Sequence, residues 1–183
     1  MSPFLVREGA LTPADCAALV AKAGAVGMQD AGLAGKTTDH ALRRADVVWL
    51  DDLADTGGVM DGLIRLVADA NRDGFDVALD DFAESAQIAR YDASRQGHFG
   101  WHSDIGRTGL AARRKLTVVV QLSDPADYAG GTLELWPDAN TFPAPVRRGT
   151  ATLFSSFVLH RVTPVTMGTR WSLTLWAHGP AYR

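Results

Sequence analysis

The spacing of hydrophobic positions along the chain changes near residue 85, from a helical period to short strand-like runs. In the first part, Cys16, Leu19 and Val20 recur at helical spacing. They follow Thr12 and Pro13, which are typical of a helix N-cap and of the first helical residue. We therefore expect a helix that begins after Thr12 and ends at about residue 23.

A second amphipathic helix is expected between residues 58 and 71. Its hydrophobic positions repeat every three or four residues and form one apolar stripe, which consists of Val59, Leu63, Leu66, Val67 and Ala70. The apolar run at residues 47–50 lies between the two helices. It is short and rich in β-branched and aromatic side chains, so it predicts a strand.

Beyond residue 85, short β-prone runs are separated by glycine, proline, aspartate and asparagine. We expect strands at residues 87–91, 98–104, 115–123, 132–136, 151–155, 161–165 and 170–177. Many short strands divided by turn residues favour a closed or two-sheet architecture over βαβ units. The predicted fold is α+β and mainly β: a double-stranded β-helix (jelly roll) core with N-terminal helices packed on one sheet. We expect one domain over residues 1–183, in which residues 1–84 support a catalytic core at residues 85–178.

Composition excludes several classes of protein. The chain has 183 residues and a formal net charge of −3, which does not indicate a nucleic-acid or anionic-membrane partner. No apolar stretch is long enough to cross a bilayer, and we expect a cytoplasmic protein. Cys16 is the one cysteine, so no internal disulfide can form, and we expect a buried structural thiol. The paired basic residues beside predicted strands are expected to be solvated: Arg43-Arg44, Arg113-Arg114-Lys115 and Arg147-Arg148.

His102 and Asp104 are two positions apart in the predicted strand at residues 98–104. Because side chains alternate along a strand, this spacing places an imidazole and a carboxylate on one face, a few ångströms apart. His160, which follows another β-rich stretch, is the candidate for a third ligand. Two histidines and one carboxylate form the facial triad of non-haem iron(II) oxygenases, which leaves coordination positions open. Structural zinc prefers a closed tetrahedral shell and fits this pattern less well.

Arg170 and Ser172 strengthen the prediction, because a His-x-Asp pair alone occurs by chance in many proteins. They are two positions apart in the predicted strand at residues 170–177, so they share a face. A guanidinium beside a hydroxyl is a suitable partner for a carboxylate, and an arginine buried in a barrel would need an anionic ligand. 2-Oxoglutarate has such a distal carboxylate, and its keto-acid end can chelate iron.

A set of motifs over about half of the chain, from about residue 87 to residue 178, resembles one known family. The motifs are W-H-S-D at 101–104, R-K-L-T-V-V-V-Q-L-S-D at 114–124, G-G-T-L-E-L at 130–135, R-G-T-A-T-L-F at 148–154 and L-H-R-V-T-P-V-T-M-G-T-R-W-S-L-T-L-W at 159–176. The chain is similar to iron(II)- and 2-oxoglutarate-dependent dioxygenases, in the prolyl 4-hydroxylase-like branch that includes PKHD-type hydroxylases. The resemblance implies the use of iron(II), 2-oxoglutarate and O₂, with ascorbate as a supporting reductant. It also implies hydroxylation of an unactivated C–H bond, with release of succinate and CO₂.

The resemblance also implies roles for individual residues. It implies that His102, Asp104 and His160 bind the iron and that Arg170 anchors 2-oxoglutarate, so these four are the catalytic candidates. Tyr91 is similar to the family's tyrosine that reaches the co-substrate from the strand before the His-x-Asp motif.

One position departs from the family's pattern. The family often has a tyrosine three residues before the first ligand, and this chain has Phe99. The missing hydroxyl removes a hydrogen bond to the co-substrate or substrate, so Tyr91 or Thr117 is a candidate to replace it. Thr117 would do so if its side chain points inward from the predicted strand at residues 115–123.

Features around the predicted site have plainer expected roles. Four tryptophans near the motifs are expected to pack in the core: Trp101, Trp136, Trp171 and Trp176. The glycine-rich and polar stretches at residues 32–46 and 92–97 are candidates for a lid over the mouth of the site.

Two functions from other classes stay open. A non-catalytic jelly-roll module for sugars or peptides would need neither a metal nor Arg170. A cupin-like metal enzyme would act without 2-oxoglutarate. Within the leading hypothesis, the substrate is a small molecule or a peptidyl residue, either prolyl or amino-acid-like, and the sequence does not separate these classes. The oligomeric state is also left open.

Overall fold

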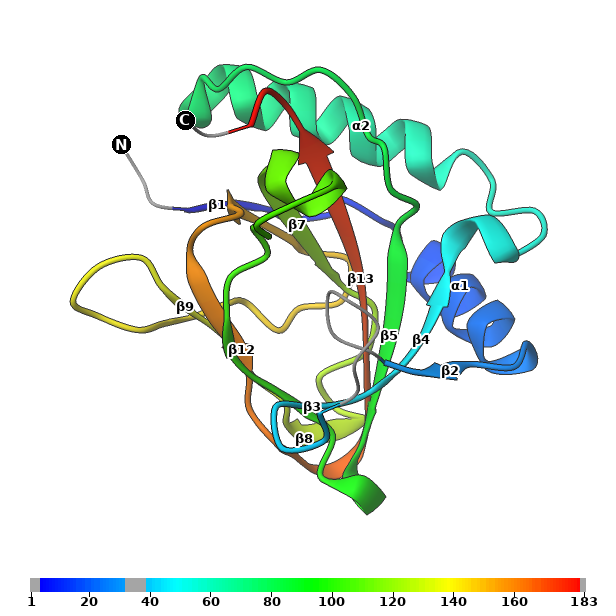
Figure 1. Cartoon of the computed structure of the whole chain (residues 1–183). Helices are drawn as coiled ribbons and strands as arrows, with labels where there is room; N and C mark the ends of the chain where they lie inside the picture. The colour runs from blue at the N-terminus through cyan, green and yellow to red at the C-terminus, as the bar shows by residue number, and fades with distance from the viewer. Residues whose placement is uncertain (1–3, 32–38, 182–183) are drawn as a thin grey trace.

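The computed structural model describes residues 4–31 and 39–181, which form two antiparallel sheets (Figure 1). The large sheet contains, in spatial order, β1 (Phe4–Arg7), β11 (Ala151–Ser155), β7 (Arg114–Gln121), β13 (Val165–His178), β5 (Gln87–Asp92), β4 (Asp46–Trp49) and β2 (Gln29–Asp30), with β8 (Tyr128–Gly130) paired to β13. The small sheet contains β10 (Phe142–Pro143), β9 (Leu133–Trp136), β12 (Leu159–Val162), β6 (His98–His102) and β3 (Arg43–Arg44). This arrangement confirms the predicted mainly-β jelly roll.

Two helices, α1 (Pro13–Ala25) and α2 (Val59–Ala70), pack on the outer face of the large sheet, on the side away from β9 and β12 (Figure 1). Leu19, Leu63 and Val67 from the helices join one buried cluster with the outward side chains of the sheet. The sheet contributes Ile88, Leu116, Val118, Val120, Leu153, Leu173 and Leu175. Each fully buried side chain of this kind stabilises the fold by roughly 1.5–3 kcal/mol, so this layer fixes the large sheet firmly.

The start of α1 agrees with its predicted capping pattern. Thr12 has extended backbone angles, and its hydroxyl oxygen accepts a hydrogen bond from the Asp15 N–H at 3.1 Å. The Asp15 carboxylate in turn accepts from the Thr12 N–H at 3.3 Å, which completes a capping box. The helix ends at Ala25, two residues later than expected, and Cys16 is fully buried beneath it, as predicted.

The inner face of the large sheet meets the small sheet, and this interior carries polar side chains as well as apolar ones. Along β13, Leu173 and Leu175 point toward the helices, while Arg170 and Ser172 alternate with them toward the interior. All four are buried. The strand therefore has two buried faces of different chemistry, of which the polar one is available for a site.

Several strand boundaries differ from the predicted ones. Strand β12 begins at Leu159, so His160 lies within a strand instead of before one, and β6 ends at His102, so Asp104 lies beyond the strand. Strand β13 begins at Val165 because its first part pairs with β8 instead of β5. Gly168 permits this pairing: its φ is +64°, and a Cβ there would lie 2.0 Å from the Asp127 carbonyl oxygen. The strands of two or three residues are too short to give a periodic signal, and they were not predicted.

Strands β1, β2 and β4 bring the first 84 residues into the large sheet together with the core strands. The extent of a single domain over residues 1–183 stays a prediction. No helix among the described residues is long and apolar enough to cross a membrane.

Replacing Thr12 by alanine is expected to lower the free energy of unfolding by about 1 kcal/mol, because alanine cannot accept the hydrogen bond from the Asp15 N–H. For a chain of this size the corresponding decrease in Tm is about 2–4 °C. Thermal unfolding followed by circular dichroism measures the change, with Thr12→Ser, which keeps the hydroxyl, as the matched control. Equal Tm values for the two variants would show that the cap does not stabilise α1.

Candidate active site

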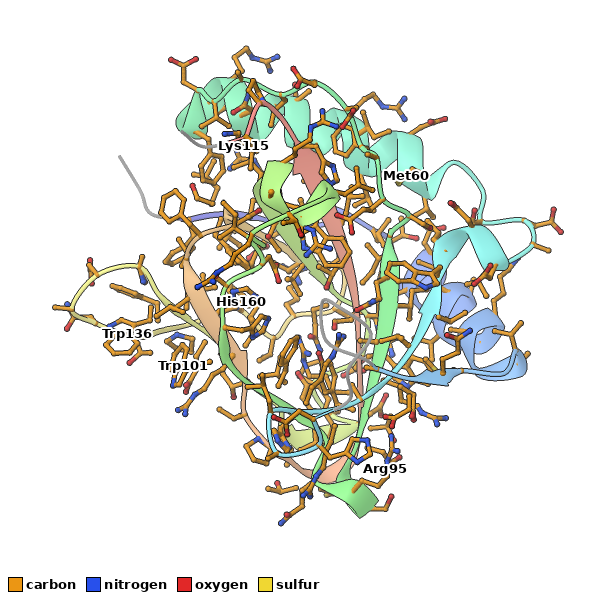
Figure 2. The ribbon with its side chains drawn as sticks, in the orientation of Figure 1. Met60, Arg95, Trp101, Lys115, Trp136 and His160 are labelled. Carbon is orange, nitrogen blue, oxygen red and sulfur yellow. The ribbon has the colours of Figure 1, made fainter. Side chains whose placement is uncertain are left out.

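Two histidines face each other across neighbouring strands of the small sheet. In the antiparallel pairing of β12 with β6, His160 is opposite His102, and their ring centroids are 4.2 Å apart. Figure 2 shows His160 directed into the space between the two sheets. Strand pairing therefore brings together two residues that are far apart in the sequence.

Backbone hydrogen bonds determine which nitrogen each imidazole offers. His102 Nδ1 lies 2.7 Å from the Gly100 carbonyl oxygen, and His160 Nδ1 lies 3.0 Å from the Val158 carbonyl oxygen. A carbonyl only accepts, so Nδ1 carries the proton in both rings and donates it. Both Nε2 atoms then have a free lone pair, which is the tautomer that binds a metal.

Asp104 completes the group, although it lies beyond the end of β6. Its N–H donates to the Ser156 carbonyl oxygen at 2.9 Å, which holds the backbone in place. Oδ2 of its carboxylate accepts hydrogen bonds from the Thr117 hydroxyl at 2.8 Å and from the Trp176 indole N–H at 3.0 Å. Two side chains thus orient the carboxylate at Oδ2, and Ser156 holds the backbone of the same residue.

The three side chains form the metal-ligating arrangement that the sequence predicts. Asp104 Oδ1 lies 3.6 Å from His102 Nε2, and Oδ2 lies 3.6 Å from His160 Nε2. The candidate ligand atoms all lie within 4.8 Å of one another. Burial on its own would raise the pKa of Asp104, but the two histidines and the Trp176 N–H lower it far below its ordinary range. The residues thus provide one anionic and two neutral donors, the set that suits iron(II).

Arg170 is the one strongly buried cation on the interior face of β13, with 2 % of its surface exposed. Its Nη1 lies 3.4 Å from the Ser172 hydroxyl, and its guanidinium carbon lies 5.5 Å from the centre of the Tyr91 ring. No carboxylate among residues 4–31 and 39–181 forms an ion pair with it. Burial lowers its pKa, an effect that Tyr91 and Tyr128 partly offset. Because a buried cation without an anion is costly, this position fits an anionic ligand.

A small polar chamber adjoins Arg170. The side chains of Gln121, Tyr128, Thr150 and Arg170 line a cavity of about 10 Å³, together with the apolar Val119 and Leu133. Gln121 Nε2 donates to the Tyr128 hydroxyl at 2.9 Å. The Thr150 hydroxyl is buried and has no hydrogen-bond partner in the described part of the chain. An orphaned hydroxyl beside an uncompensated guanidinium indicates that a polar ligand belongs here.

A cavity of about 450 Å³ gives access to the triad from the surface. His102, Asp104, Tyr91 and Phe99 lie in its wall. The Phe99 ring stacks on the His102 ring with centroids 3.5 Å apart, and the Arg43 guanidinium carbon lies 4.5 Å from the Phe99 ring centre on the same wall. Phe99 therefore packs directly against a candidate ligand, where the family's tyrosine would add a hydroxyl.

The structure thus brings together the residues singled out in the sequence, and it shows that one of them, Thr117, contacts a candidate ligand. Tyr91 and Ser172 lie beside Arg170, as expected. The Thr117 hydroxyl points inward but donates to Asp104 and lies 3.0 Å from the Ser156 hydroxyl. Contact of Tyr91, Ser172 and Thr117 with a co-substrate stays a prediction.

Some expectations about neighbouring residues were wrong. Arg43 is 8 % exposed instead of solvated, and Arg114 forms a largely buried ion pair with Glu84. Trp136 does not pack in the core: it is 45 % exposed and lies beside Trp101 at the outer side of the small sheet (Figure 2). These side chains lie in two-sided strands, so the sequence does not show which face is covered.

Other residues that support the site were not predicted from the sequence, or were predicted in another role. Trp176 shares the period-two face of Arg170 and Ser172, and that signal could have placed it in the interior instead of in the core packing. Ser156, Tyr128 and Glu84 are in loops or short strands and gave no periodic signal. Of the two candidate lids, residues 92–97 include a 3-10 turn, η3 (Ala93–Arg95), and residues 32–38 of the other lie outside the described residues.

A jelly roll whose interior holds two histidines, one carboxylate and a buried arginine has the architecture of a non-haem iron(II) oxygenase. Comparison with known proteins agrees. Residues 86–178, just over half of the chain, match the family described as the 2OG-Fe(II) oxygenase superfamily. The chain belongs to this superfamily, whose cofactors are iron(II) and 2-oxoglutarate.

Curated relatives cover parts of the chain. A PKHD-type hydroxylase of Azoarcus sp. (strain BH72) is 34% identical over 82 residues, which are 43% of this chain and 36% of that protein. A PKHD-type hydroxylase of Paracoccus denitrificans is 34% identical over 93 residues, which are 48% of this chain and 40% of that protein. The matched segments span less than half the length of either relative.

Solved structures match nearly the whole chain. A Pseudomonas putida prolyl-4-hydroxylase has a TM-score of 0.76 at 23% identity, over 96% of this chain and 92% of that one. A Trichoplax adhaerens prolyl hydroxylase, in complex with a peptide fragment of the hypoxia inducible factor oxygen degradation domain, has a TM-score of 0.77 at 18% identity. That match covers 97% of this chain and 84% of the other. At these identities the likeness shows the shared fold.

Acidification is expected to destabilise the metal-free protein through His160. Burial lowers the pKa of His160 to about 4, below its ordinary value of 6.5. Between these values the unfolded chain binds a proton that the folded protein excludes. This contribution to the free energy of unfolding is intact above pH 6.5 and falls by up to about 1.4 kcal/mol per pH unit toward pH 4. Urea unfolding in EDTA across this pH range measures the slope. His160→Gln should flatten this slope, whereas His98→Gln, at a half-buried histidine, should leave it unchanged. An unchanged slope in His160→Gln would contradict the assignment.

Proposed function

We propose that the chain is an iron(II)- and 2-oxoglutarate-dependent hydroxylase in which His102, Asp104 and His160 bind the metal and Arg170 anchors the co-substrate. The observation that carries this proposal is the buried guanidinium of Arg170, which shares the interior with the triad and has no carboxylate partner among the described residues. A metal site alone would not require such a cation. A dicarboxylate that reaches from the triad to Arg170 would compensate its charge.

When bound, iron(II) and 2-oxoglutarate supply the oxidising chemistry, which couples decarboxylation to succinate and CO₂ with hydroxylation of a C–H bond. The chain's own residues set the geometry. The Gly100 and Val158 carbonyls keep the His102 and His160 Nε2 lone pairs directed at the same space. Thr117 and Trp176 both donate hydrogen bonds to Oδ2 of Asp104, and the lone pairs of Oδ1 therefore stay available for a metal.

The side chains around Arg170 offer donors for the distal carboxylate of the co-substrate, and the chamber of about 10 Å³ between them has to widen to admit it. The guanidinium can donate two parallel hydrogen bonds, and the hydroxyls of Tyr128, Thr150 and Ser172 are close enough to the chamber to add others. Val119 and Leu133 supply apolar walls that exclude water from the rest of the molecule. Gly131 makes room for this packing, since a Cβ there would lie 3.0 Å from Arg170 Cδ.

We infer a prolyl, peptidyl or amino-acid-like substrate that enters through the cavity of about 450 Å³. This volume is in the ordinary range for a small-molecule site and would also admit one side chain of a bound peptide. Aromatic side chains in its wall, Trp49, Phe99 and Trp176, suit a partly apolar substrate. A cytoplasmic location is part of the same proposal, because the buried thiol of Cys16 and the use of ferrous iron both suit a reducing compartment.

The assay for this proposal combines metal binding, co-substrate binding and turnover. Anaerobic addition of iron(II) and then 2-oxoglutarate should give a visible charge-transfer band, and His102→Ala should abolish it. Arg170→Met, which keeps the packing volume but removes the charge, is expected to weaken 2-oxoglutarate binding by roughly 10- to 150-fold, equivalent to about 1.5–3 kcal/mol for charge-assisted hydrogen bonds. Succinate release is then measured against amino acids, proline-containing peptides and cell extract.

Arg161→Met is the matched control for Arg170→Met, because Arg161 adjoins a ligand in sequence but pairs with Glu134 at 2.7 Å, outside the cavity lining. Its affinity for 2-oxoglutarate should equal that of the parent. The proposal fails if the parent gives no band and releases no succinate, or if His102→Ala binds iron as well as the parent. Turnover that requires the metal but whose rate does not depend on 2-oxoglutarate would indicate a cupin-like enzyme instead.

A further inference from the structure

Glu84 connects the N-terminal part of the chain to the site. It lies in the segment between α2 and β5, two residues before the matched family region begins. Its carboxylate accepts two hydrogen bonds from Arg114, Nε to Oε2 at 2.6 Å and Nη2 to Oε1 at 2.5 Å. It also accepts one from Nε2 of the fully buried His178 at 2.9 Å. His178 Nδ1 accepts from the Ala83 N–H at 3.3 Å, so Nε2 carries the proton that Glu84 accepts.

Arg114 connects Glu84 to Asp104 through two sets of contacts. Its remaining Nη1 donates to the backbone carbonyl oxygen of Asp104 at 3.1 Å. Its guanidinium carbon lies 4.0 Å from the ring centre of Trp176, whose indole N–H donates to Asp104 Oδ2 at 3.0 Å. Arg114 therefore supports both the main chain and the carboxylate of Asp104.

We propose that Glu84 is a positioning residue for the metal centre, which holds Arg114 in the one orientation that fixes the Asp104 carboxylate toward the metal. This inference rests on the proposed function, because it assigns Asp104 as a ligand. Glu84 does not reach the ligand atoms itself and acts only through Arg114. Hydrogen-bond partners of ligands are known to orient them and to change metal affinity, commonly by 10- to 100-fold.

The location of the Arg114–Glu84 pair explains why its loss would change the position of Asp104. The side chains of Arg114 and Glu84 are only 13% and 16% exposed, and both lie in the wall of the 450 Å³ cavity. Burial on its own would raise the pKa of Glu84, but Arg114 and His178 outweigh it and lower the pKa. Without the carboxylate, the guanidinium would be left partly buried and unpaired. It would then turn toward water in the cavity and release the Asp104 carbonyl.

An ion pair that merely attached the segment before β5 to the core would need no contact with a ligand. The Arg161–Glu134 pair is such a case: Arg161 Nε donates to Glu134 at 2.7 Å, and neither residue hydrogen-bonds to the triad. It lies next to His160 in sequence, yet neither residue lies in the wall of the cavity. This pair therefore provides a matched control.

Cobalt(II) alone, added to the 183-residue chain, tests the inference without relying on turnover. Glu84→Gln keeps the shape and one acceptor but removes the charge, and we expect it to weaken cobalt(II) binding about 10-fold and to shift the ligand-field absorption of the bound ion. Glu134→Gln should leave the affinity and the spectrum unchanged. Arg114→Met should lower the affinity for cobalt(II) at least as much as Glu84→Gln does. The double variant should have no lower affinity than Arg114→Met, because Glu84 acts only through Arg114.

Thermal unfolding in EDTA separates positioning from folding. The inference is supported if Glu84→Gln retains a cooperative transition and shows the loss of affinity with the altered spectrum; if that variant does not fold, Glu84→Asp takes its place in the same comparison. Parental affinity and spectrum in a folded Glu84 variant would overturn it and leave the proposed function intact. A parent protein that does not bind cobalt(II), or a His102→Ala variant that binds as the parent does, would overturn both.

Discussion

The site depends on β13 being buried on both faces. Leu173 and Leu175 are covered by the helices, and this packing fixes the strand so that Arg170, Ser172 and Trp176 point between the sheets. If the helical layer were absent, the large sheet would expose the apolar side of β13 to water, and no force would hold its polar side in the interior. The N-terminal helices thus contribute to function although none of their residues lies in the wall of the cavity that leads to the triad.

A buried polar interior is stable only if its charges are compensated, and this constraint relates the triad to Arg170. Arg170 is buried away from water and the described residues offer it no carboxylate, while Asp104 lies at the wall of the cavity with only 10% of its side chain exposed. Iron(II) would add positive charge beside Asp104, and 2-oxoglutarate would add a carboxylate beside Arg170, so each of the two separated charges would gain a partner of opposite sign while their sum stays at zero. Stability and ligand binding are therefore coupled: the same buried charges that make the empty interior costly favour the two ligands together.

The part of the site that could be predicted from the sequence is the part that depends on the two-residue spacing of side chains along single strands. The alternation along β13 predicted that Arg170 and Ser172 share a face, and the His-x-Asp spacing predicted that His102 and Asp104 lie close together. The position of His160 within β12 was misjudged, because a strand of four residues gives little periodic signal. The complete set of supports of Asp104 could not be predicted, although alternation along the strands is a signal that Thr117 and Trp176 face the interior. Ser156, Thr117, Trp176 and Arg114 reach it from separate parts of the chain, and only the closed fold brings them together.

The two kinds of ligand are consequently held in different ways. Each histidine is oriented by a carbonyl two residues away and by the β6–β12 pairing, so its geometry is largely a property of one strand pair. Asp104 lies outside a strand and receives its orientation from tertiary contacts, which end at Glu84 and His178 in the segment before β5 and at the end of β13. Changes in packing far from the metal should therefore alter the orientation of the Asp104 carboxylate more readily than that of the two imidazoles.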